Sequence, residues 1–362
     1  MSQRKFFIQW DSTNDCNLNC SHCYHNREGE YHSKHQQNEE NLMAFEEVKS
    51  MIDDLDQTCK RWSFSPRFQI SGGEPLKRGD LLEIIDYTKS LNIETILLTN
   101  GTLITRKVAR ELKLRGIKRL QISIDGNKET NNRIRGMPYA YDKALEGIRN
   151  CATEGIKVTV SMTAMQCNKS QLEDIIVNSI RCGAKYVGFQ SYVPNPKLGI
   201  NDPEFIDSRG IYQLSKETRK LEGIYGDQIH ILQTEVLWQL MQWDTKLKRE
   251  ARKTGKFLSG CGAGFSGLSV LSDGTVYPCR RLPIIIGHIS EGIRKIMLES
   301  EVLKNLRDFD IMKENCCERV YYCRGCRAIA YATTGDYMAR DPMCFKDFVK
   351  EEDIQPRVIR RW

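Results

Sequence analysis

The chain has 362 residues, of which 28% are charged and 40% hydrophobic, so it is globular rather than disordered, and its length favours about two domains. Lys and Arg outnumber Asp and Glu by 54 to 47, and this net charge of +7 is too small for so long a chain to indicate nucleic-acid binding. No run approaches the roughly 18 apolar residues of a membrane span, and the first residues lack the apolar stretch of an export signal. Membrane, collagenous and disordered classes are excluded.

Short apolar or β-branched runs alternate with segments of helical periodicity along most of the chain. The predicted strands cover residues 6–10, 67–71, 94–99, 119–124, 157–162 and 186–191. The predicted helices cover residues 45–55, 80–91, 105–115, 141–154, 169–181 and 208–222. Six strands that alternate with six helices predict an α/β fold with a parallel sheet. Because polar motifs recur at the carboxyl ends of the strands, a partial TIM-like (β/α)6 barrel fits better than a doubly wound sheet.

Helix boundaries carry their own signals. Asp80 and Asn168 precede two of the predicted helices and are predicted to cap them. Gly116, Gly155 and Gly183 follow three helices, at the position where a left-handed backbone ends a helix. The predicted organisation is a barrel over residues 1–225, a helical bridge over 226–258 and a small Cys-rich domain with a tail over 259–362.

Cysteine is the unusual residue of this chain. Fourteen Cys without an export signal indicate a reducing compartment, the cytoplasm, where thiols bind metal more often than they form disulfides. Three of them lie near the start of the chain and seven lie after residue 260. The remaining four are scattered singly and are predicted to be small buried hydrophobes: Cys59, Cys151, Cys167 and Cys182.

The first cluster, Cys16-Asn-Leu-Asn-Cys20-Ser-His-Cys23, follows the first predicted strand at the edge where barrel active sites lie. Three thiolates can hold three irons of a cubane cluster and leave the fourth iron without a protein ligand. An open metal position is typical of catalysis. Zinc is the alternative, but structural zinc sites use four ligands, usually in two separated pairs.

This CX3CX2C motif resembles that of radical S-adenosylmethionine (SAM) enzymes. The resemblance implies that Cys16, Cys20 and Cys23 bind a catalytic [4Fe-4S] cluster and that SAM chelates the open iron. An electron from the cluster then cleaves SAM to a 5′-deoxyadenosyl radical, which abstracts a substrate hydrogen. The residue before the last Cys is commonly aromatic and packs near the adenine; here it is His22, which also offers a flat ring.

Further motifs of this family follow along the barrel. Gly72-Gly73-Glu74 ends the second strand and matches the GGE motif, whose glycines admit a close ligand and whose carboxylate suits the SAM ammonium. Thr99-Asn100-Gly101 ends the third strand and resembles a motif whose polar side chains contact SAM, which implies that role for Asn100.

The fourth strand carries two more residues of this kind. Ser123 and Asp125 point to one face by the period of two, and the resemblance implies contacts with the SAM ribose and methionine. Arg135 resembles the family arginine that meets the SAM carboxylate, with a surface salt bridge as the alternative.

The second cluster resembles a SPASM domain, the extension of peptide-modifying radical SAM enzymes. Ser272-Asp273-Gly274-Thr275 predicts a hairpin turn that brings Cys261 and Cys279 together. By the resemblance, one auxiliary [4Fe-4S] cluster is held by Cys261, Cys279 and Cys326. The other is held by Cys317 (or Cys316), Cys323 and Cys344.

The SPASM pattern is not complete. The usual Cys three positions before Cys317 is Glu314 here, and Cys316 is the candidate replacement. Two cubanes require eight ligands and seven Cys are present, so one cluster keeps an open iron, a non-Cys group completes it, or only one auxiliary cluster forms. Zinc at the Cys323–Cys326 pair is a further alternative.

The leading hypothesis for the substrate is a peptide or protein that is cross-linked or oxidised, with the auxiliary clusters as electron relay or substrate site. The Cys motif begins at residue 16, so leader-peptide recognition is expected from a separate protein or from the polar segment 24–42. The resemblance also implies a flavodoxin- or ferredoxin-type reductant, and no nucleic-acid or membrane partner is expected.

Three alternatives compete with the peptide hypothesis. Sulfatase maturases have an aspartate directly after the Cys at the position of Cys279, but this chain has Arg280 there. Arg280 and Arg281 instead suit an anionic substrate, such as a carboxylate-bearing tetrapyrrole of haem-type pathways. An iron–sulfur electron carrier is the non-enzymatic alternative, but it has no use for the GGE or ribose motifs.

Overall fold

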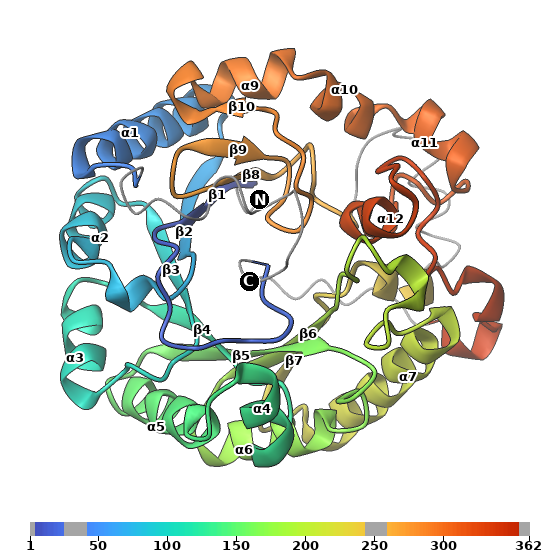
Figure 1. The fold of residues 1–362 in the computed structure, drawn as a ribbon, viewed down its shortest axis with the longest axis horizontal. Helices are drawn as coiled ribbons and strands as arrows, with labels where there is room; N and C mark the ends of the chain where they lie inside the picture. Colours follow the sequence, from blue (N-terminus) through green and yellow to red (C-terminus); the bar gives the residue numbers. More distant parts are fainter. Residues whose placement is uncertain (1–3, 25–41, 243–258, 355–362) are drawn as a thin grey trace.

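The computed structural model describes residues 4–24, 42–242 and 259–354. Within these residues the strands form a ten-stranded sheet in the order β10-β9-β8-β1-β2-β3-β4-β5-β6-β7. From β1 to β7 each strand is parallel to its neighbours. The helices form an outer ring around this sheet (Figure 1). The predicted α/β fold, a partial barrel followed by a Cys-rich region, is confirmed.

Each element has defined bounds. The strands are β1 (Lys5–Asp11), β2 (Ser65–Ser71), β3 (Glu94–Thr99), β4 (Arg119–Ser123), β5 (Lys157–Ala164), β6 (Tyr186–Ser191), β7 (His230–Leu232), β8 (Gly267–Val270), β9 (Thr275–Tyr277) and β10 (Gly287–His288). The α-helices are α1 (Phe45–Trp62), α2 (Leu81–Ser90), α3 (Arg106–Leu114), α4 (Lys128–Arg135), α5 (Ala140–Thr153), α6 (Leu172–Arg181), α7 (Ser208–Tyr225), α9 (Ile293–Glu299), α10 (Glu301–Arg307), α11 (Phe309–Asn315) and α12 (Arg327–Thr334). Short 3-10 helices are η2 (Pro75–Lys77), η3 (Gly199–Asn201), η4 (Val236–Gln242), η5 (Ile289–Glu291), η6 (Lys346–Phe348) and η7 (Glu351–Asp353).

The main hydrophobic core lies between the strands and the outer helices. In β1, Phe6, Ile8 and Trp10 are buried in this core. Because side chains alternate along a strand, the residues between them face the interior of the barrel. Gln9 and Gln69, which pair in register on β1 and β2, line an internal cavity there. The barrel interior is therefore polar and hollow, whereas the apolar packing lies outside the sheet.

All six predicted barrel strands and all six predicted helices are present, with boundaries shifted by a few residues. The largest shift is at α1, which continues to Trp62 and ends where Ser63 is left-handed. Gly116, Gly155 and Gly183 have φ values of 92°, 71° and 83°, as the predicted helix ends require. The sequence analysis did not predict α4, which begins after the N-cap Asn127, whose side chain accepts from the Thr130 amide. It also did not predict α9 to α12.

One predicted cap is wrong and one is correct only in position. The helix expected after Asn168 begins at Leu172, and Asn168 instead accepts from the Met165 amide and donates to the Asp125 and Thr163 carbonyls. The Asn168 side chain thus stabilises the turn that follows β5, and its hydrogen-bonding groups are not available to cap the helix. Asp80 is the N-cap residue of α2, but its carboxylate makes no capping hydrogen bond and binds Arg78.

The predicted hairpin near the second Cys cluster is confirmed. Strands β8 and β9 pair antiparallel, and Gly274 in the turn has a φ of 88°. Strand β8 also pairs parallel with β1, so the Cys-rich region extends the barrel sheet. In Figure 1 these orange strands lie beside the blue β1.

The interval predicted as a helical bridge, 226–258, begins with a strand. Strand β7 pairs with β6 and is followed by η4, while residues 243–258 lie outside the described residues. The domain boundaries in this interval stay a prediction. Residues 25–41 of the polar segment 24–42 also lie outside the described residues. Among the described helices none has both the length and the apolar character needed to cross a bilayer.

Candidate active site

The first three cysteines lie in the loop that follows β1. The chain leaves the sheet at Asp11, and residues 12–24 run across the carboxyl ends of the strands (Figure 1). The end of α4 holds this loop, since the amides of Asn19 and Ser21 donate to the carbonyls of Arg135 and Ile134 at 3.3 and 2.8 Å. The loop is thus fixed by an element more than a hundred residues later in the chain.

The two glycines of the GGE motif pack against the start of the same loop, between Thr13 and Asp15. A Cβ atom on Gly73 would lie 2.2 Å from the Asp15 carbonyl oxygen, and one on Gly72 would lie 2.5 Å from that of Thr13. The Gly73 amide donates to the Thr13 carbonyl at 2.7 Å. Gly72 also has a φ of 128°, which favours glycine. These glycines are required for packing against the Cys loop, in addition to any ligand contact.

The Glu74 carboxylate, which is expected from the sequence to suit the SAM ammonium, is surrounded by protein groups. Its side chain is fully buried and accepts from the Thr99 hydroxyl at 2.6 Å, the Asn100 amide at 2.9 Å and the Leu76 amide at 3.2 Å. Burial raises the pKa of Glu74. The carboxylate therefore ties β2 to the end of β3 and positions Asn100, while its predicted contact with SAM stays a prediction.

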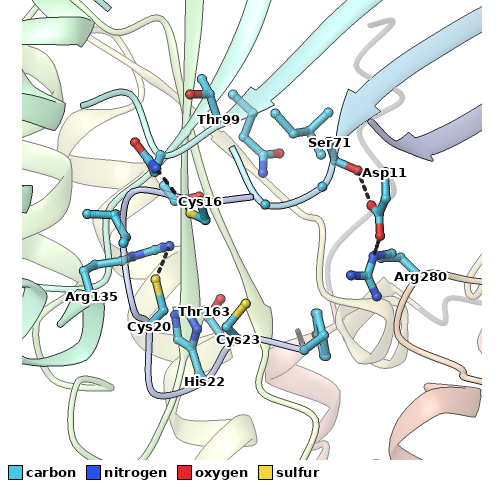
Figure 2. Close-up of a pocket in the computed structure, with 18 of the residues that line it drawn as sticks. Asp11, Cys16, Cys20, His22, Cys23, Ser71, Thr99, Arg135, Thr163 and Arg280 are labelled. Carbon is cyan, nitrogen blue, oxygen red and sulfur yellow. Dashed lines mark hydrogen bonds and ion pairs between the residues drawn. The ribbon is translucent and has the colours of Figure 1, made fainter. Parts of the chain in front are cut away.

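Two side chains donate to the thiols of the loop. Asn100 Nδ2 lies 3.9 Å from Cys16 Sγ, and Arg135 Nη1 lies 3.7 Å from Cys20 Sγ (Figure 2). Burial raises the pKa of Cys16 to about 11 and also raises that of Cys20. Since metal binds the thiolate, these donors stabilise the form of sulfur that a cluster requires.

Asp125 is the centre of a buried network. Its Oδ2 lies 2.6 Å from Arg135 Nη2 and 2.8 Å from His22 Nε2, while Oδ1 accepts from the Thr163 amide at 2.8 Å. Burial alone would raise the pKa of Asp125, but the charges of Arg135 and His22 outweigh it and lower the pKa to about 2. The carboxylate is ionised and fully engaged with protein groups, so it orients Arg135 and His22 and is not itself directed at the pocket.

The thiols and their partners surround a cavity of about 240 Å³. The predicted site residues that line this cavity are Cys16, Cys20, His22, Cys23, Gly72, Gly73, Asn100, Ser123 and Arg135. Glu74 and Asp125 are not among the residues that line this cavity. Three thiols, a glycine cradle and polar strand ends on one cavity fit a cluster with SAM. Asp11, Thr163 and Tyr192 also line it, and no motif in the sequence identified them.

The sequence assigns the auxiliary thiols to two groups. The charge of Cys261 acts on both Cys279 and Cys326, and burial raises the pKa of each of these two thiols. Cys323 responds to the charges of Cys344 and Cys317, and burial raises its pKa.

Cys316 interacts with Cys317, the next residue in the chain. A hydrogen bond from the Cys316 thiol lowers the pKa of Cys317 to about 6. The assignment of these thiols to two auxiliary clusters, with Cys317 or Cys316 as a ligand of the second, stays a prediction. Within the three described ranges, no three His, Cys, Asp or Glu side chains are arranged to hold a single metal ion.

A second cavity, of about 590 Å³, occupies the barrel interior beside the first. Gln9, Ser123, Thr163 and Arg280 line both cavities, and the lining of the second also includes Cys279. This polar space therefore extends from the first Cys loop to the first auxiliary thiol group.

Arg280 and Arg281 are held in place at this junction. Arg280 forms an ion pair with Asp11, which accepts from the Ser71 hydroxyl at 2.9 Å (Figure 2). Arg281 Nη1 donates to the Ser191 carbonyl at 2.9 Å. Both arginines line the larger cavity, so the structure brings two cations to the space between the first Cys loop and the auxiliary thiols.

Comparison with known proteins identifies relatives of both halves. Residues 10–176 match the model of the radical SAM superfamily, and residues 261–327 match that of SPASM, an iron–sulfur cluster-binding domain. An AdoMet-dependent heme synthase from Methanosarcina barkeri is 32% identical over 95% of this chain and 97% of that protein. A PqqA peptide cyclase from Bradyrhizobium diazoefficiens is 27% identical over 92% of this chain and 84% of that protein. The solved structure of native anSMEcpe with bound AdoMet has a TM-score of 0.71 at 19% identity and covers 94% of each chain.

Proposed function

Because the chain belongs to the radical SAM superfamily and carries a SPASM domain, we propose that it modifies a carboxylate-bearing small molecule of the tetrapyrrole class. As a member of this superfamily it is an enzyme that binds SAM and [4Fe-4S] clusters. Together, SAM and the first cluster supply a radical that abstracts hydrogen from a substrate carbon. The residues proposed to hold that cluster are Cys16, Cys20 and Cys23.

The observation that carries the proposal is the position of Arg280. It lines both the cavity beside the first Cys loop and the larger cavity that reaches Cys279. Its ion pair with Asp11 fixes the guanidinium, and an arginine held in this way is suited to bidentate recognition of a carboxylate. A substrate carboxylate bound there would place the neighbouring carbons beside the SAM cavity.

Arg281 supports the same class of substrate. It follows Arg280 directly, lines the larger cavity and is anchored on the Ser191 carbonyl at 2.9 Å. Two adjacent cations at the junction suit a substrate that presents more than one carboxylate. The similarity to a heme synthase over 95% of this chain supports a tetrapyrrole as that substrate.

A peptide is the second candidate, and it is favoured by one specific observation. The similarity to a PqqA peptide cyclase also covers most of this chain. A glutamate or aspartate side chain of a peptide would suit the arginine pair as well. A sulfatase maturase is less well supported, since Arg280 stands where the aspartate is expected and the nearby Asp11 is engaged by Arg280 and Ser71.

The test is turnover of a defined probe. We expect the anaerobically reconstituted enzyme, with SAM and a reductant, to convert an iron porphyrin with propionate side chains and to form 5′-deoxyadenosine in proportion. Mass spectrometry of the porphyrin would report loss of carboxyl groups or oxidation. Arg281→Gln should raise KM at least about tenfold, because a charge-assisted hydrogen bond contributes about 1.5–3 kcal/mol. The matched control is Arg294→Gln, an exposed arginine on α9.

Two outcomes would contradict this proposal. If the porphyrin stays unchanged while SAM is cleaved at a normal rate, the radical chemistry stands and the substrate assignment is wrong. Conversion of an acidic peptide under the same conditions would then favour the second candidate. If Arg281→Gln leaves KM unchanged, the arginine pair does not bind the substrate carboxylates.

A further inference from the structure

Two arginines that flank the Cys326 position are completely buried. Arg324 and Arg327 have exposed fractions of 0%, and they are among the largest fully buried side chains of the described residues. Burial of an ionised side chain costs several kcal/mol unless nearby groups compensate its charge. The groups around the two guanidinium groups therefore indicate the role of these buried charges.

Arg324 is held in an unfavourable backbone conformation as well as in an apolar site. Its φ of 68° lies in the left-handed region, which a residue with a Cβ rarely adopts. Nη1 donates to the Leu306 carbonyl at 2.8 Å, Nη2 donates to the Ala263 carbonyl at 3.2 Å, and the guanidinium lies 4.5 Å from the Phe265 ring centre. The fold thus fixes this cation tightly at some cost in free energy.

Arg324 lies beside members of both auxiliary thiol groups. It follows Cys323 directly, and its Nη2 donates to the carbonyl of Ala263, two residues after Cys261. The Cys261 amide in turn donates to the Cys323 carbonyl at 3.3 Å. Burial lowers the pKa of Arg324 to about 10, and the charges of Cys261 and Cys323 act in the opposite direction. Cys261 belongs to the first group and Cys323 to the second. A single guanidinium is therefore within electrostatic reach of both groups.

Arg327 lies on the side of the second group. Its Nη1 donates to the carbonyls of Tyr337 and Ala339 at 3.0 and 2.8 Å, and it lies 3.4 Å from Met312 Sδ. Met312 belongs to α11, whose C-cap residue is Cys316. Arg327 is also the first residue of α12, directly after Cys326.

We propose that Arg324 and Arg327 are positioning residues that place fixed positive charge on the auxiliary clusters and set their reduction potentials, Arg324 for both and Arg327 for the second. Thiolate-bound iron–sulfur clusters are anionic, and their reduction adds a further negative charge. A buried cation nearby stabilises the reduced form and raises the potential. The inference rests on the auxiliary clusters of the SPASM domain and not on the identity of the substrate.

The test measures potentials rather than turnover. In the full chain with Cys16, Cys20 and Cys23 changed to Ala, the iron signals come from the auxiliary clusters alone. We expect Arg324→Gln to make the reduction potentials of both auxiliary clusters more negative by about 59 mV. This shift corresponds to a tenfold change in the equilibrium constant of a one-electron reduction. Arg327→Gln should shift only one of them. Exposed Arg294→Gln is the control and should shift neither.

Arg324→Lys separates charge from packing. This variant keeps the charge, so it should retain the full iron content and potentials close to those of the parent. If Arg324→Gln loses iron and Arg324→Lys keeps it, the charge is what the clusters require. The proposal is overturned if Arg324→Gln binds iron fully with unchanged potentials. It is also overturned if Lys and Gln lose iron equally, or shift the potentials equally.

Discussion

Arg135 Nη2 lies 2.6 Å from Asp125 Oδ2. The same guanidinium donates from Nη1 to Cys20 Sγ at 3.7 Å, and Asp125 is anchored by the Thr163 amide. The carboxylate after β4 therefore aims a cation at a thiol on the loop after β1. Two distant motifs of the sequence act as one unit.

Asp125→Asn tests this unit. Loss of the carboxylate leaves the buried Arg135 without its anionic partner, and breaking such a pair costs about 3–5 kcal/mol. We expect the free energy of unfolding of the metal-free protein to fall by about this amount in anaerobic urea titrations. Asp86→Asn, which breaks an exposed pair with Arg115, should cost under about 1 kcal/mol. Equal losses in the two variants would mean that Asp125 has no special role.

Gly73→Ala tests the contact between the GGE motif and the Cys loop. The new Cβ would lie 2.2 Å from the Asp15 carbonyl oxygen, so the loop has to move. We expect the iron content per chain after reconstitution to fall by the amount of iron that the first cluster contains. Gly79→Ala is the matched control, because nothing lies within 4 Å of a Cβ built there. Full iron in Gly73→Ala would show that the loop tolerates the shift.

Cys20→Ala and Cys344→Ala distinguish the two thiol regions. The first variant should lose SAM cleavage and keep the auxiliary iron. The second should retain part of the SAM cleavage and lose substrate turnover, because Cys344 lies with the second auxiliary group. Measurement of 5′-deoxyadenosine and of iron decides both. Complete loss of cleavage in Cys344→Ala would mean that this group supports the barrel structurally.

The iron content tests the division of the auxiliary thiols into two groups. Three cubane clusters correspond to about twelve irons per chain after anaerobic reconstitution, and two correspond to about eight. Because the predicted assignment gives Cys261, Cys279 and Cys326 to one auxiliary cluster and the other auxiliary thiols to a second, we expect about twelve. About eight irons would mean that one of the groups binds no cluster.

Glu94 gives a pH dependence that is independent of the clusters. Burial would raise the pKa of Glu94, but hydrogen bonds from Lys5 and Arg67 outweigh it and lower the pKa. A lowered carboxyl pKa adds stability above the ordinary value of about 4.3, and that contribution is lost as pH falls through the folded-state pKa.

The matching variant is Glu94→Gln. Because this site is about one-third exposed, Glu94→Gln should destabilise by at most about 1 kcal/mol at neutral pH. The difference from the parent should vanish in acid. A difference that persists unchanged in acid would exclude the ion pairs as its cause.

The sequence predicted the barrel well, because each βα unit carries local signals: an apolar run, a turn and helical periodicity. It predicted β8 and β9 for the same reason, since a Gly-containing turn marks the hairpin. It did not predict that β8 pairs with β1, because this register joins residues about 260 positions apart. No local pattern encodes such a pairing.

The sequence predicted which residues belong to the site better than it predicted what each side chain does. The thiol spacing and GGE motif identified residues that gather around one cavity. The sequence could not show that Glu74 and Asp125 turn away from the cavity toward protein partners, because this depends on donors from other strands, such as Thr99 and Thr163. For the same reason Asp11 was missed, since its importance arises only through Arg280.

The parallel pairing of β1 with β8 also has a mechanical consequence. Residues from Phe7 to Trp10 are in register with residues from Gly267 to Val270, and a Cβ on Gly267 would collide with the Phe7 carbonyl oxygen. A hinge that swung the two halves apart would have to break this ladder. The relative position of the first Cys loop, which leaves β1, and of the chain that continues from β8 into the auxiliary thiols is therefore set by the sheet.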